Sequence, residues 1–234
     1  MIASLIRLLT GRSYQVRSRD IGYLLAKGGW PLLRGVTWSL RHFRRPNGLL
    51  LGPYISFVMG RQLQAGRGAA IGGYSYVDCS ADQGIVLGAR VTIRERAWIQ
   101  GRSGLNQPAA GLWIEDGSYI GPNAVLGIGG PIRIGANVQI GAGFTISAES
   151  HVADDDGSYV TGRVDRRGVL VGDRCWIGNN VVVLDGVEIG EGCVIGAASV
   201  VTRSLPPFSL AFGAPATVRR TLRPSRPADY TDGG

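Results

Sequence analysis

Between Val171 and Leu205 the apolar positions recur every six residues. Divided into sixes, the stretch reads VGDRCW, IGNNVV, VLDGVE, IGEGCV, IGAASV and VTRSLP. An aliphatic residue opens each unit, and glycine follows it in four of the six. A period of six fits neither a helix nor an alternating strand, but it fits a solenoid with one flat side per unit. Three sides close a triangular coil, with the aliphatic residues inside and coils stacked about 4.8 Å apart. We expect the glycines to turn the corners at positive φ.

The same repeat begins raggedly near Leu63 and continues, with interruptions, to Leu205. Its units predict five to six coils, on the order of 25 Å of solenoid. The inward positions of the clean units are Ile134, Ile140, Ile146, Ile177, Ile189 and Ile195. Residues 100–112 break the register with glycine and proline and are typical of a loop. We therefore predict an all-β fold in which residues 63–205 form a parallel β-helix.

Residues 152–170 make the largest break in the repeat, and the segment is rich in Asp and Arg. Long polar loops on rigid scaffolds often carry function. We predict that this segment protrudes from the β-helix. Residues 206–234 would form a C-terminal extension and tail.

Residues 1–62 do not follow the repeat and are expected to form a basic, amphipathic N-terminal cap. Apolar residues recur at helical spacing within 30–45, and arginines surround them. The apolar positions are Trp30, Leu33, Val36, Leu40 and Phe43, and the arginines are Arg34, Arg41, Arg44 and Arg45. One interpretation is a cap over the open end of the solenoid, whose first coil exposes an unpaired edge. The other is a helix lying on a membrane surface. We favour the cap, in which Trp30, Leu33 and Leu40 are buried, and the two interpretations are compatible.

Composition narrows the choice of compartment and partner. The formal net charge of +8 favours an anionic partner. Arg7 interrupts the apolar start and no small-residue cleavage site follows, so we reject a signal peptide and expect a cytoplasmic protein. Cys175 and Cys193 lie eighteen residues apart and should be small buried hydrophobes on adjacent coils. No C-x-x-C zinc pair is present, and we expect no metal.

His151 is the best candidate for a catalytic residue. It is one of two histidines in the chain, and it stands at the root of the long polar loop. At that position its ring would face a groove and not the core. His42 lies in the basic N-terminal segment and is better explained as a surface residue.

From about residue 63 to 220 the chain resembles the bacterial hexapeptide-repeat acyltransferases. The resemblance is carried by ISAESH at 146–151, the loop, and then the repeat ending in VVTRSLPPFSLAFGAPA. Within the family, the sequence is most similar to O-acetyltransferases of sugars and surface polysaccharides, of the galactoside, maltose and colanic-acid type. The resemblance implies a left-handed parallel β-helix, acetyl-CoA as co-substrate, and a homotrimer with the acyl-CoA groove between neighbouring subunits.

The resemblance also implies residue roles. His151 would be the general base that takes the proton of a sugar hydroxyl, a task that suits an imidazole near neutral pH. The backbone amide of Asn179 would stabilise the oxyanion. Amides near Gly178 and Ala197 would hold the pantetheine arm, and Arg203 would meet the CoA phosphates.

The sequence does not decide which group hydrogen-bonds to His151 and orients its ring. By resemblance, Asn123 is the nearest match to an asparagine of the preceding coil, and Glu149 or a backbone carbonyl are alternatives. Trp176 resembles an aromatic residue near the active site of relatives, although an outward position under the loop or against another subunit explains it equally well. Trp98 is a second outward aromatic that a neighbouring subunit could bury.

Two departures limit what the resemblance implies. Thr217 stands where relatives often carry lysine, and residues 1–62 do not match the sugar-binding segment of the galactoside and maltose enzymes. The acceptor therefore stays open between a sugar hydroxyl, an amino sugar and an antibiotic hydroxyl, and an inactive scaffold is a further alternative.

Two histidines cannot supply the three zinc ligands of a γ-type carbonic anhydrase. The repeat shows no aromatic-rich basic platform, so we expect no nucleic-acid partner. A membrane contact through residues 30–45, at the inner face of the membrane, is compatible with a lipid-carried acceptor.

Overall fold

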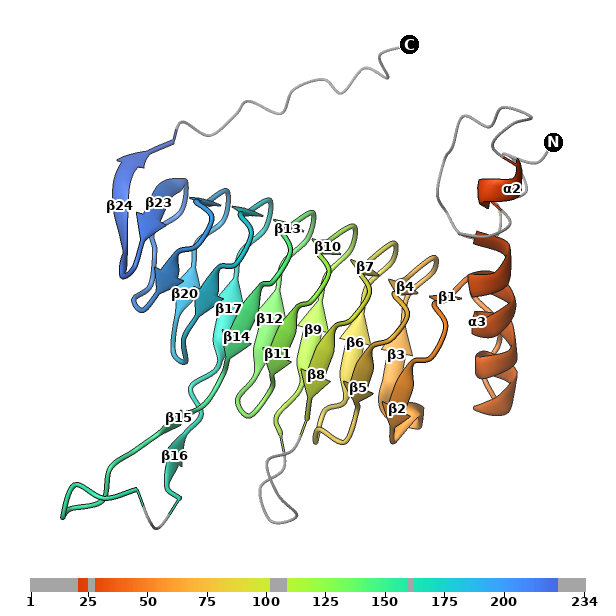
Figure 1. Ribbon diagram of the computed structural model, residues 1–234, viewed down its shortest axis with the longest axis horizontal. Helices are drawn as coiled ribbons and strands as arrows, with labels where there is room; N and C mark the ends of the chain where they lie inside the picture. Colours follow the sequence, from red (N-terminus) through yellow and green to blue (C-terminus); the bar gives the residue numbers. More distant parts are fainter. Residues whose placement is uncertain (1–20, 25–27, 102–108, 160–161, 223–234) are drawn as a thin grey trace.

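The protein is a triangular prism of short parallel strands, seen here in a computed structural model that describes residues 21–24, 28–101, 109–159 and 162–222 (Figure 1). Three parallel sheets form the sides. The first, face 1, contains β1 (Leu50–Leu51), β4 (Ala70–Ile71), β7 (Thr92–Ile93), β10 (Tyr119–Ile120), β13 (Gln139–Ile140), β18 (Trp176–Ile177), β21 (Val194–Ile195), β23 (Ser209–Gly213) and β24 (Ala216–Thr221). The strand β24 pairs antiparallel with β23 and ends the sheet.

The other two sides follow along the chain in each coil. Face 2 contains β2 (Ser56–Val58), β5 (Tyr76–Asp78), β8 (Trp98–Gln100), β11 (Val125–Gly127), β14 (Thr145–Ser147), β19 (Val182–Val183) and β22 (Val200–Val201). Face 3 contains β3 (Leu63–Ala65), β6 (Ile85–Leu87), β9 (Leu112–Ile114), β12 (Ile132–Ile134), β17 (Val169–Val171) and β20 (Glu188–Ile189). The chain runs from face 1 to face 2 to face 3, so each coil has an edge 1–2, an edge 2–3 and an edge 3–1.

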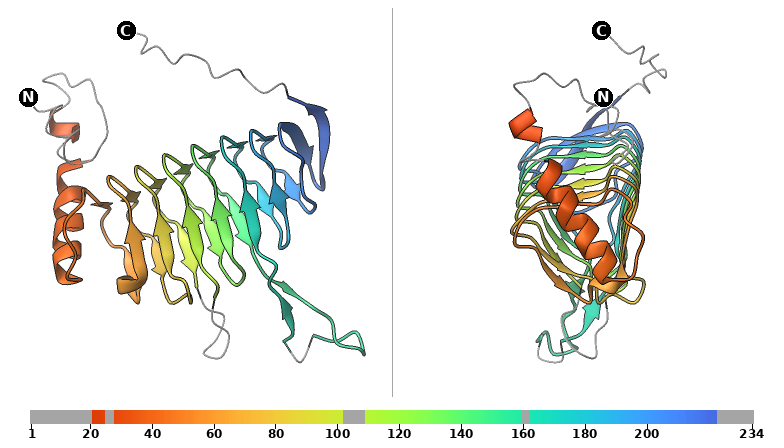
Figure 2. Two further views of the ribbon diagram at one scale, coloured as in Figure 1. Left: turned by 180° about the vertical axis from the view of Figure 1, so that it is seen from behind. Right: turned by 90° about the vertical axis from the view of Figure 1, so that its right-hand side faces the viewer.

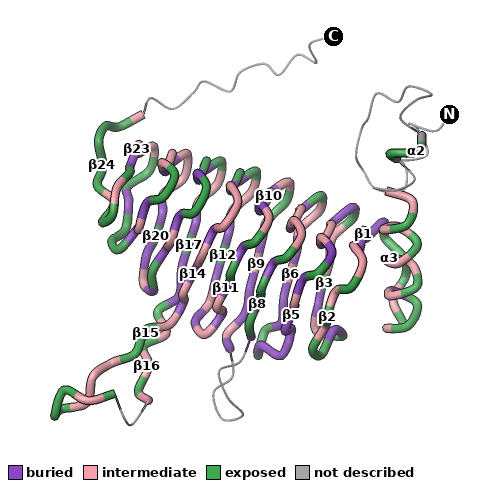
Figure 3. Tube along the Cα trace, viewed as in Figure 1, coloured by how far each residue is buried: buried purple, intermediate pink, exposed green. Residues whose placement is uncertain are grey.

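The expected inward residues form the core of this left-handed parallel β-helix. The six isoleucines predicted to point inward are each at most 2% exposed. Equivalent positions of successive coils pair in register, as Ile140 does with Ile120 and Ile177. Figure 3 shows buried residues alternating with exposed ones along the coils. The fold predicted from the six-residue period is confirmed.

The β-helix begins earlier than predicted. A complete first coil, β1, β2 and β3, starts at Leu50, thirteen residues before the expected boundary at Leu63, and the seven strands of face 2 indicate seven coils where five to six were expected. Leu51, Phe57 and Leu63 do keep the spacing of six. Phenylalanine replaces the aliphatic residue at the middle position and the following glycine is missing from two of the three units, so the pattern is weak in the sequence.

The corner glycines have a different role from the one predicted. Those that follow the inward aliphatic residue, such as Gly172 and Gly178, do not adopt positive φ. Their Cβ atoms would instead meet the backbone of the next coil: at Gly178 a Cβ would lie 2.6 Å from the amide nitrogen of Ala197. Positive φ occurs two residues later and is often taken by another residue type, as at Arg174 and Asn180. The glycines are required by the close stacking of coils, and the prediction of a positive φ there was wrong.

All three cysteines are buried, as expected for Cys175 and Cys193, which stack on adjacent coils beside paired strands. Burial raises the pKa of the Cys79 thiol to about 12. The Cys79 side chain therefore fills space in the core.

The N-terminal helix α3 (Trp30–Arg41) lies across the open end of the prism (Figure 2, right), and a short helix α2 (Ile21–Leu24) precedes it. Its contact with the first coil uses small residues: Gly35 and Ser39 are buried, and a Cβ at Gly35 would collide with the carbonyl oxygen of Leu49. The expected burial of Trp30, Leu33 and Leu40 is wrong, because these side chains are 62%, 52% and 59% exposed. The helix caps the solenoid with its small face and turns its apolar face outward.

Four predicted segments fall partly outside the described residues: the cap at 1–20 and 25–27, the first loop at 102–108, the protruding loop at 160–161 and the tail at 223–234. None of the described helices is long and apolar enough to cross a membrane.

Candidate functional site

A cleft of about 290 Å³ lies along edge 1–2 near the C-terminal coils. On face 1 it is lined by three stacked outward side chains of successive coils: Tyr119, Gln139 and Trp176, which occupy paired positions of β10, β13 and β18. Its other wall is the corner backbone of three coils, at Gly141, Gly178–Asn179 and Ala197. Four of the residues predicted for oxyanion or cofactor binding thus meet in one cleft: Trp176, Gly178, Asn179 and Ala197.

Two backbone N–H groups in this cleft lack a hydrogen-bond acceptor because the residue at the same corner one coil later has no acceptor side chain. At several corners the N–H group is satisfied by a side chain of the following coil: Ala136 donates to Oδ1 of Asp173 (2.9 Å) and Ala142 to Oδ1 of Asn179 (2.9 Å). One coil after Asn179, the equivalent corner residue is Ala197, whose side chain offers no acceptor to the N–H of Asn179. Within the described part of the chain, the N–H groups of Asn179 and Ala197 therefore have no hydrogen-bond acceptor.

Gly178 contributes differently from the prediction. Its N–H donates to the carbonyl oxygen of Ile195 (2.9 Å) and belongs to the ladder between coils. Because Gly178 lacks a side chain, the backbone at Ala197 can approach closely. The structure thus leaves Asn179 and Ala197 as the donors of the predicted set.

His151 lies on a hairpin at edge 2–3, which projects away from the prism (Figure 1). The strand β15 (Ser150–His151) pairs antiparallel with β16 (Val164–Asp165), and His151 is opposite Val164. The His151 side chain is exposed and makes no hydrogen bond with any described residue. This hairpin lies within the segment 152–170 that was predicted to protrude, but its first strand begins earlier, at Ser150, and Val169 and Leu170 already belong to β17 on face 3. Residues 160–161 lie outside the described residues.

Two carboxylates anchor the base of the hairpin. Glu149 accepts from Nε of Arg166 at 3.3 Å, both side chains being 24% exposed. Asp185, whose side chain is 1% exposed, accepts from the N–H groups of Gly168 (2.7 Å) and Arg167 (3.2 Å). Sequence analysis missed Asp185. The only signal is an aspartate at the corner of the unit VLDGVE, which forms edge 2–3 one coil after the hairpin leaves.

We expect Asp185→Ala to loosen the hairpin that carries His151. The buried N–H of Gly168 would lose its acceptor, which typically costs about 1–3 kcal/mol in the free energy of unfolding. Hydrogen exchange at Arg167, Gly168 and the hairpin should accelerate. Asp173→Ala is the matched control, because Asp173 satisfies a corner amide in the same way at edge 3–1. Equal acceleration in the hairpin for both variants would contradict the anchoring role.

The predicted site residues occupy two different edges of one chain. Asn123 lies at the edge 1–2 corner between β10 and β11, on the same edge as the cleft but not among its lining residues. His151, Glu149 and Arg203 lie along edge 2–3. The width of face 2, about 15 Å for five extended residues, separates the two groups. Within one chain Asn123 therefore does not orient His151. Glu149, the alternative partner, is paired with Arg166.

Two segments of the β-helix match known protein families. Residues 168–203 match the bacterial transferase hexapeptide family (six repeats), and residues 111–148 match the hexapeptide repeat of succinyl-transferase. The two matched segments span 36 and 38 residues, 74 of 234, so hexapeptide repeats of transferases are matched over about a third of the chain. The matched segments contain the corner at Asn179 and Ala197 and the two coils that precede the hairpin.

Individual relatives cover the repeats only in part. A provisionally named acetyltransferase of Staphylococcus aureus (strain COL) is 49% identical over 61 residues, 26% of this chain and 31% of the relative. Galactoside O-acetyltransferase of Lactococcus lactis is 42% identical over 65 residues, 28% of this chain and 31% of the enzyme. The chain thus spans about a third of the length of these curated relatives.

A solved structure supports the fold over a longer range. A mutant of AntD, an N-acyltransferase from Bacillus cereus in complex with dTDP and coenzyme A, superposes with a TM-score of 0.50. The match covers 74% of this chain and 86% of AntD, at 19% sequence identity. At this identity the similarity concerns the fold alone.

Proposed function

We propose that this hexapeptide-repeat protein is a CoA-dependent O-acetyltransferase that transfers an acetyl group to a hydroxyl of a sugar or surface-polysaccharide precursor. The observation that carries the proposal is the edge 1–2 cleft, where the amides of Asn179 and Ala197 are open donors beside Trp176. A thioester and its amide-containing pantetheine arm need such backbone donors. Acetyl-CoA would lie along this edge, with the N–H of Ala197 on the arm and that of Asn179 at the thioester carbonyl.

In the proposed reaction His151 carries one proton from the acceptor hydroxyl to the CoA sulfur. The neutral imidazole takes the proton of the acceptor hydroxyl as its oxygen bonds to the thioester carbonyl carbon. The carbonyl oxygen becomes an oxyanion that the N–H of Asn179 stabilises. When the tetrahedral intermediate collapses, the C–S bond breaks and the imidazolium returns its proton to the CoA sulfur. The products are the acetyl ester and CoA, and no metal is required.

The two groups of residues would form one site between copies of the chain. In a homotrimer with parallel solenoids, edge 2–3 of one protomer, carrying His151 and Arg203, would face edge 1–2 of its neighbour, carrying Asn179 and Ala197. Arg203 is exposed on the last coil, at the end of the groove where CoA phosphates would lie. Exposed Trp98 and Trp176, on faces 2 and 1, are candidates for burial in that assembly. A neighbouring protomer could also bring its Asn123 to His151.

The test is acetyl transfer to a panel of nucleotide-linked and polyprenyl-linked sugars, followed by CoA release and by the mass and linkage of the product. We expect an alkali-labile ester on a sugar hydroxyl. An alkali-stable amide on an amino sugar would replace the proposal with an N-acyltransferase. Failure to bind acetyl-CoA in calorimetry would contradict any CoA-dependent activity and favour an inactive scaffold.

A further inference from the structure

The positive charge of the chain is concentrated at one end. Residues 1–77 contain eleven of the 25 lysines and arginines but one of the 17 acidic residues, Asp20. The remaining residues therefore carry a small net negative charge. Six of the eleven lie among the described residues of α3, the first coil and the segments beside them: Arg34, Arg41, Arg44, Arg45, Arg61 and Arg67. The described residues up to Val77 contain no Asp or Glu, so this end of the prism carries an excess of positive charge.

The exposed face of α3 at this end is apolar. Trp30, Leu33 and Leu40 lie three and seven residues apart, on one side of the helix, and each is more than half exposed. Phe43, just after the helix, is 88% exposed. The opposite side of α3 is held against the first coil through Gly35 and Ser39. Because that side is already in contact, the apolar stripe lies on the side of α3 that faces away from the first coil. Figure 2 (right) shows α3 lying across this end of the prism.

Arginines border this stripe in two structurally distinct pairs. Arg34 donates to the carbonyl oxygen of Leu51 (3.3 Å) and Arg44 to that of Arg61 (2.7 Å), so both help to fix the cap. Arg41 and Arg45 are exposed and make no ion pair with any described residue. This pair offers charges that folding does not use.

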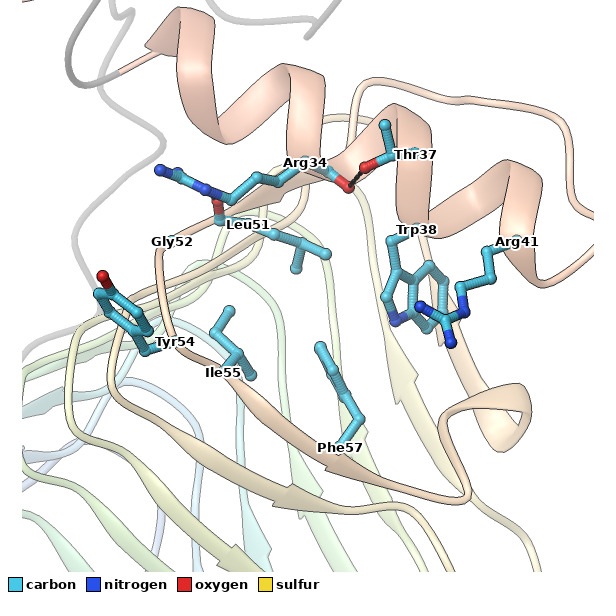
Figure 4. A pocket seen from close by; sticks show the side chains of 9 residues that line it. All are labelled: Arg34, Thr37, Trp38, Arg41, Leu51, Gly52, Tyr54, Ile55 and Phe57. Carbon is cyan, nitrogen blue, oxygen red and sulfur yellow. Dashed lines mark hydrogen bonds between the residues drawn. The ribbon is translucent and has the colours of Figure 1, made fainter.

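A second cleft, of about 330 Å³, opens between α3 and the first coil. Figure 4 shows Arg34 and Arg41 at its two ends, and Ile55, Phe57 and the indole of Trp38 between them. The buried Nε1 of Trp38 has no hydrogen-bond partner among the described residues. An apolar floor with a cationic rim matches the arrangement of acyl and phosphate groups at a phospholipid interface.

We propose that the N-terminal end of the prism docks on an anionic phospholipid membrane, with the Trp30–Leu33–Leu40 stripe in the interface and Arg41 and Arg45 on lipid phosphates. Charge complementarity selects an anionic partner. The exposed apolar stripe selects a bilayer over nucleic acid, because phosphate contacts alone would leave it in water. The solenoid axis would then stand on the membrane. If the trimer proposed above forms with parallel axes, three such faces point the same way, and their binding is multivalent.

The test is co-sedimentation of the full chain with vesicles of phosphatidylglycerol and phosphatidylcholine, and with vesicles of phosphatidylcholine alone. We expect selective binding to the anionic vesicles, weakened at high salt. Arg41→Gln with Arg45→Gln should weaken binding at least about tenfold. Leu33→Ala with Leu40→Ala should weaken it by about tenfold, because the buried apolar area falls. All four positions are exposed, so circular dichroism should show an unchanged fold.

The matched control is Arg219→Gln with Arg220→Gln, which removes the same charge from exposed residues at the opposite end. Its affinity for anionic vesicles should stay within about twofold of the wild-type value. If both arginine pairs lower the affinity for anionic vesicles equally, binding depends only on the net charge of the chain, and the proposal is overturned. Failure of the wild-type chain to bind anionic vesicles would also overturn it. So would tight binding to a DNA duplex that Leu33→Ala with Leu40→Ala leaves intact.

Discussion

His151→Ala is expected to lower turnover by about 10²- to 10⁴-fold, the range for loss of a general base. The affinity for CoA should change little, because the proposed CoA contacts are the open amides at edge 1–2 and Arg203. Stability should also hold, since the His151 side chain is exposed and makes no hydrogen bond with any described residue. Steady-state kinetics with acetyl-CoA, CoA titration calorimetry and thermal unfolding together test this expectation.

His42→Ala is the matched control, because His42 is the other histidine. Its ring stacks on Trp38 at 4.2 Å, and its Nδ1 lies 2.8 Å from the carbonyl oxygen of Trp38. It belongs to the N-terminal cap, so its loss should leave turnover near the wild-type value. If His151→Ala retains wild-type turnover, the histidine assignment is wrong, and Glu149 or a loop aspartate is the next residue to test.

A mixture of two inactive variants should recover activity, because each proposed site uses edges from two copies. His151→Ala removes the base from edge 2–3, and Ala197→Glu fills the edge 1–2 cleft with a side chain of the same charge as CoA. Each variant alone should be nearly inactive. After subunit exchange in an equal mixture, about a quarter of the interfaces combine an intact histidine with an intact cleft, so about a quarter of the wild-type activity should return.

The control takes each variant through the same exchange procedure by itself. Light scattering must also report a trimer for both, since a monomer would contradict the shared site directly. Activity that stays at background in the mixture, with trimers present, would show that His151 and the cleft do not serve one reaction across an interface.

Much of the candidate site could be predicted from local sequence. His151 stands where the repeat is interrupted, and the structure places it on a projecting hairpin. Trp176, Asn179 and Ala197 were predicted from a resemblance that depends on repeat register, and a shared register brings them together at one edge. The open state of the two amides was not predicted. It depends on whether the corner of the next coil offers a side-chain acceptor, which is a relation between residues one coil apart.

The contacts that anchor the hairpin could not be predicted from the sequence. Asp185 looks like one more corner residue in a repeat unit, yet its buried carboxylate holds the amides of Arg167 and Gly168. Glu149 was a candidate partner of His151, but it contacts Arg166 across the base of the hairpin. Both contacts join segments that lie 17 or 18 residues apart. Their pairing depends on how the loop leaves and re-enters the coil.

The sequence by itself determined the solenoid. A six-residue period places two side chains of each unit on the inside, the aliphatic residue that opens the unit and the residue four places later, as at Ile177 and Val181. Coiling and stacking bury both positions. Only the tertiary structure decided which side of α3 faces the first coil, because the choice depends on Gly35 fitting against the carbonyl oxygen of Leu49 and not on the hydrophobicity of the helix. It also decided that His151 and Asn179 lie on different edges. A linear repeat shows the positions within each unit, but the edge that each unit reaches depends on where loops and extra residues enter the three-sided coil.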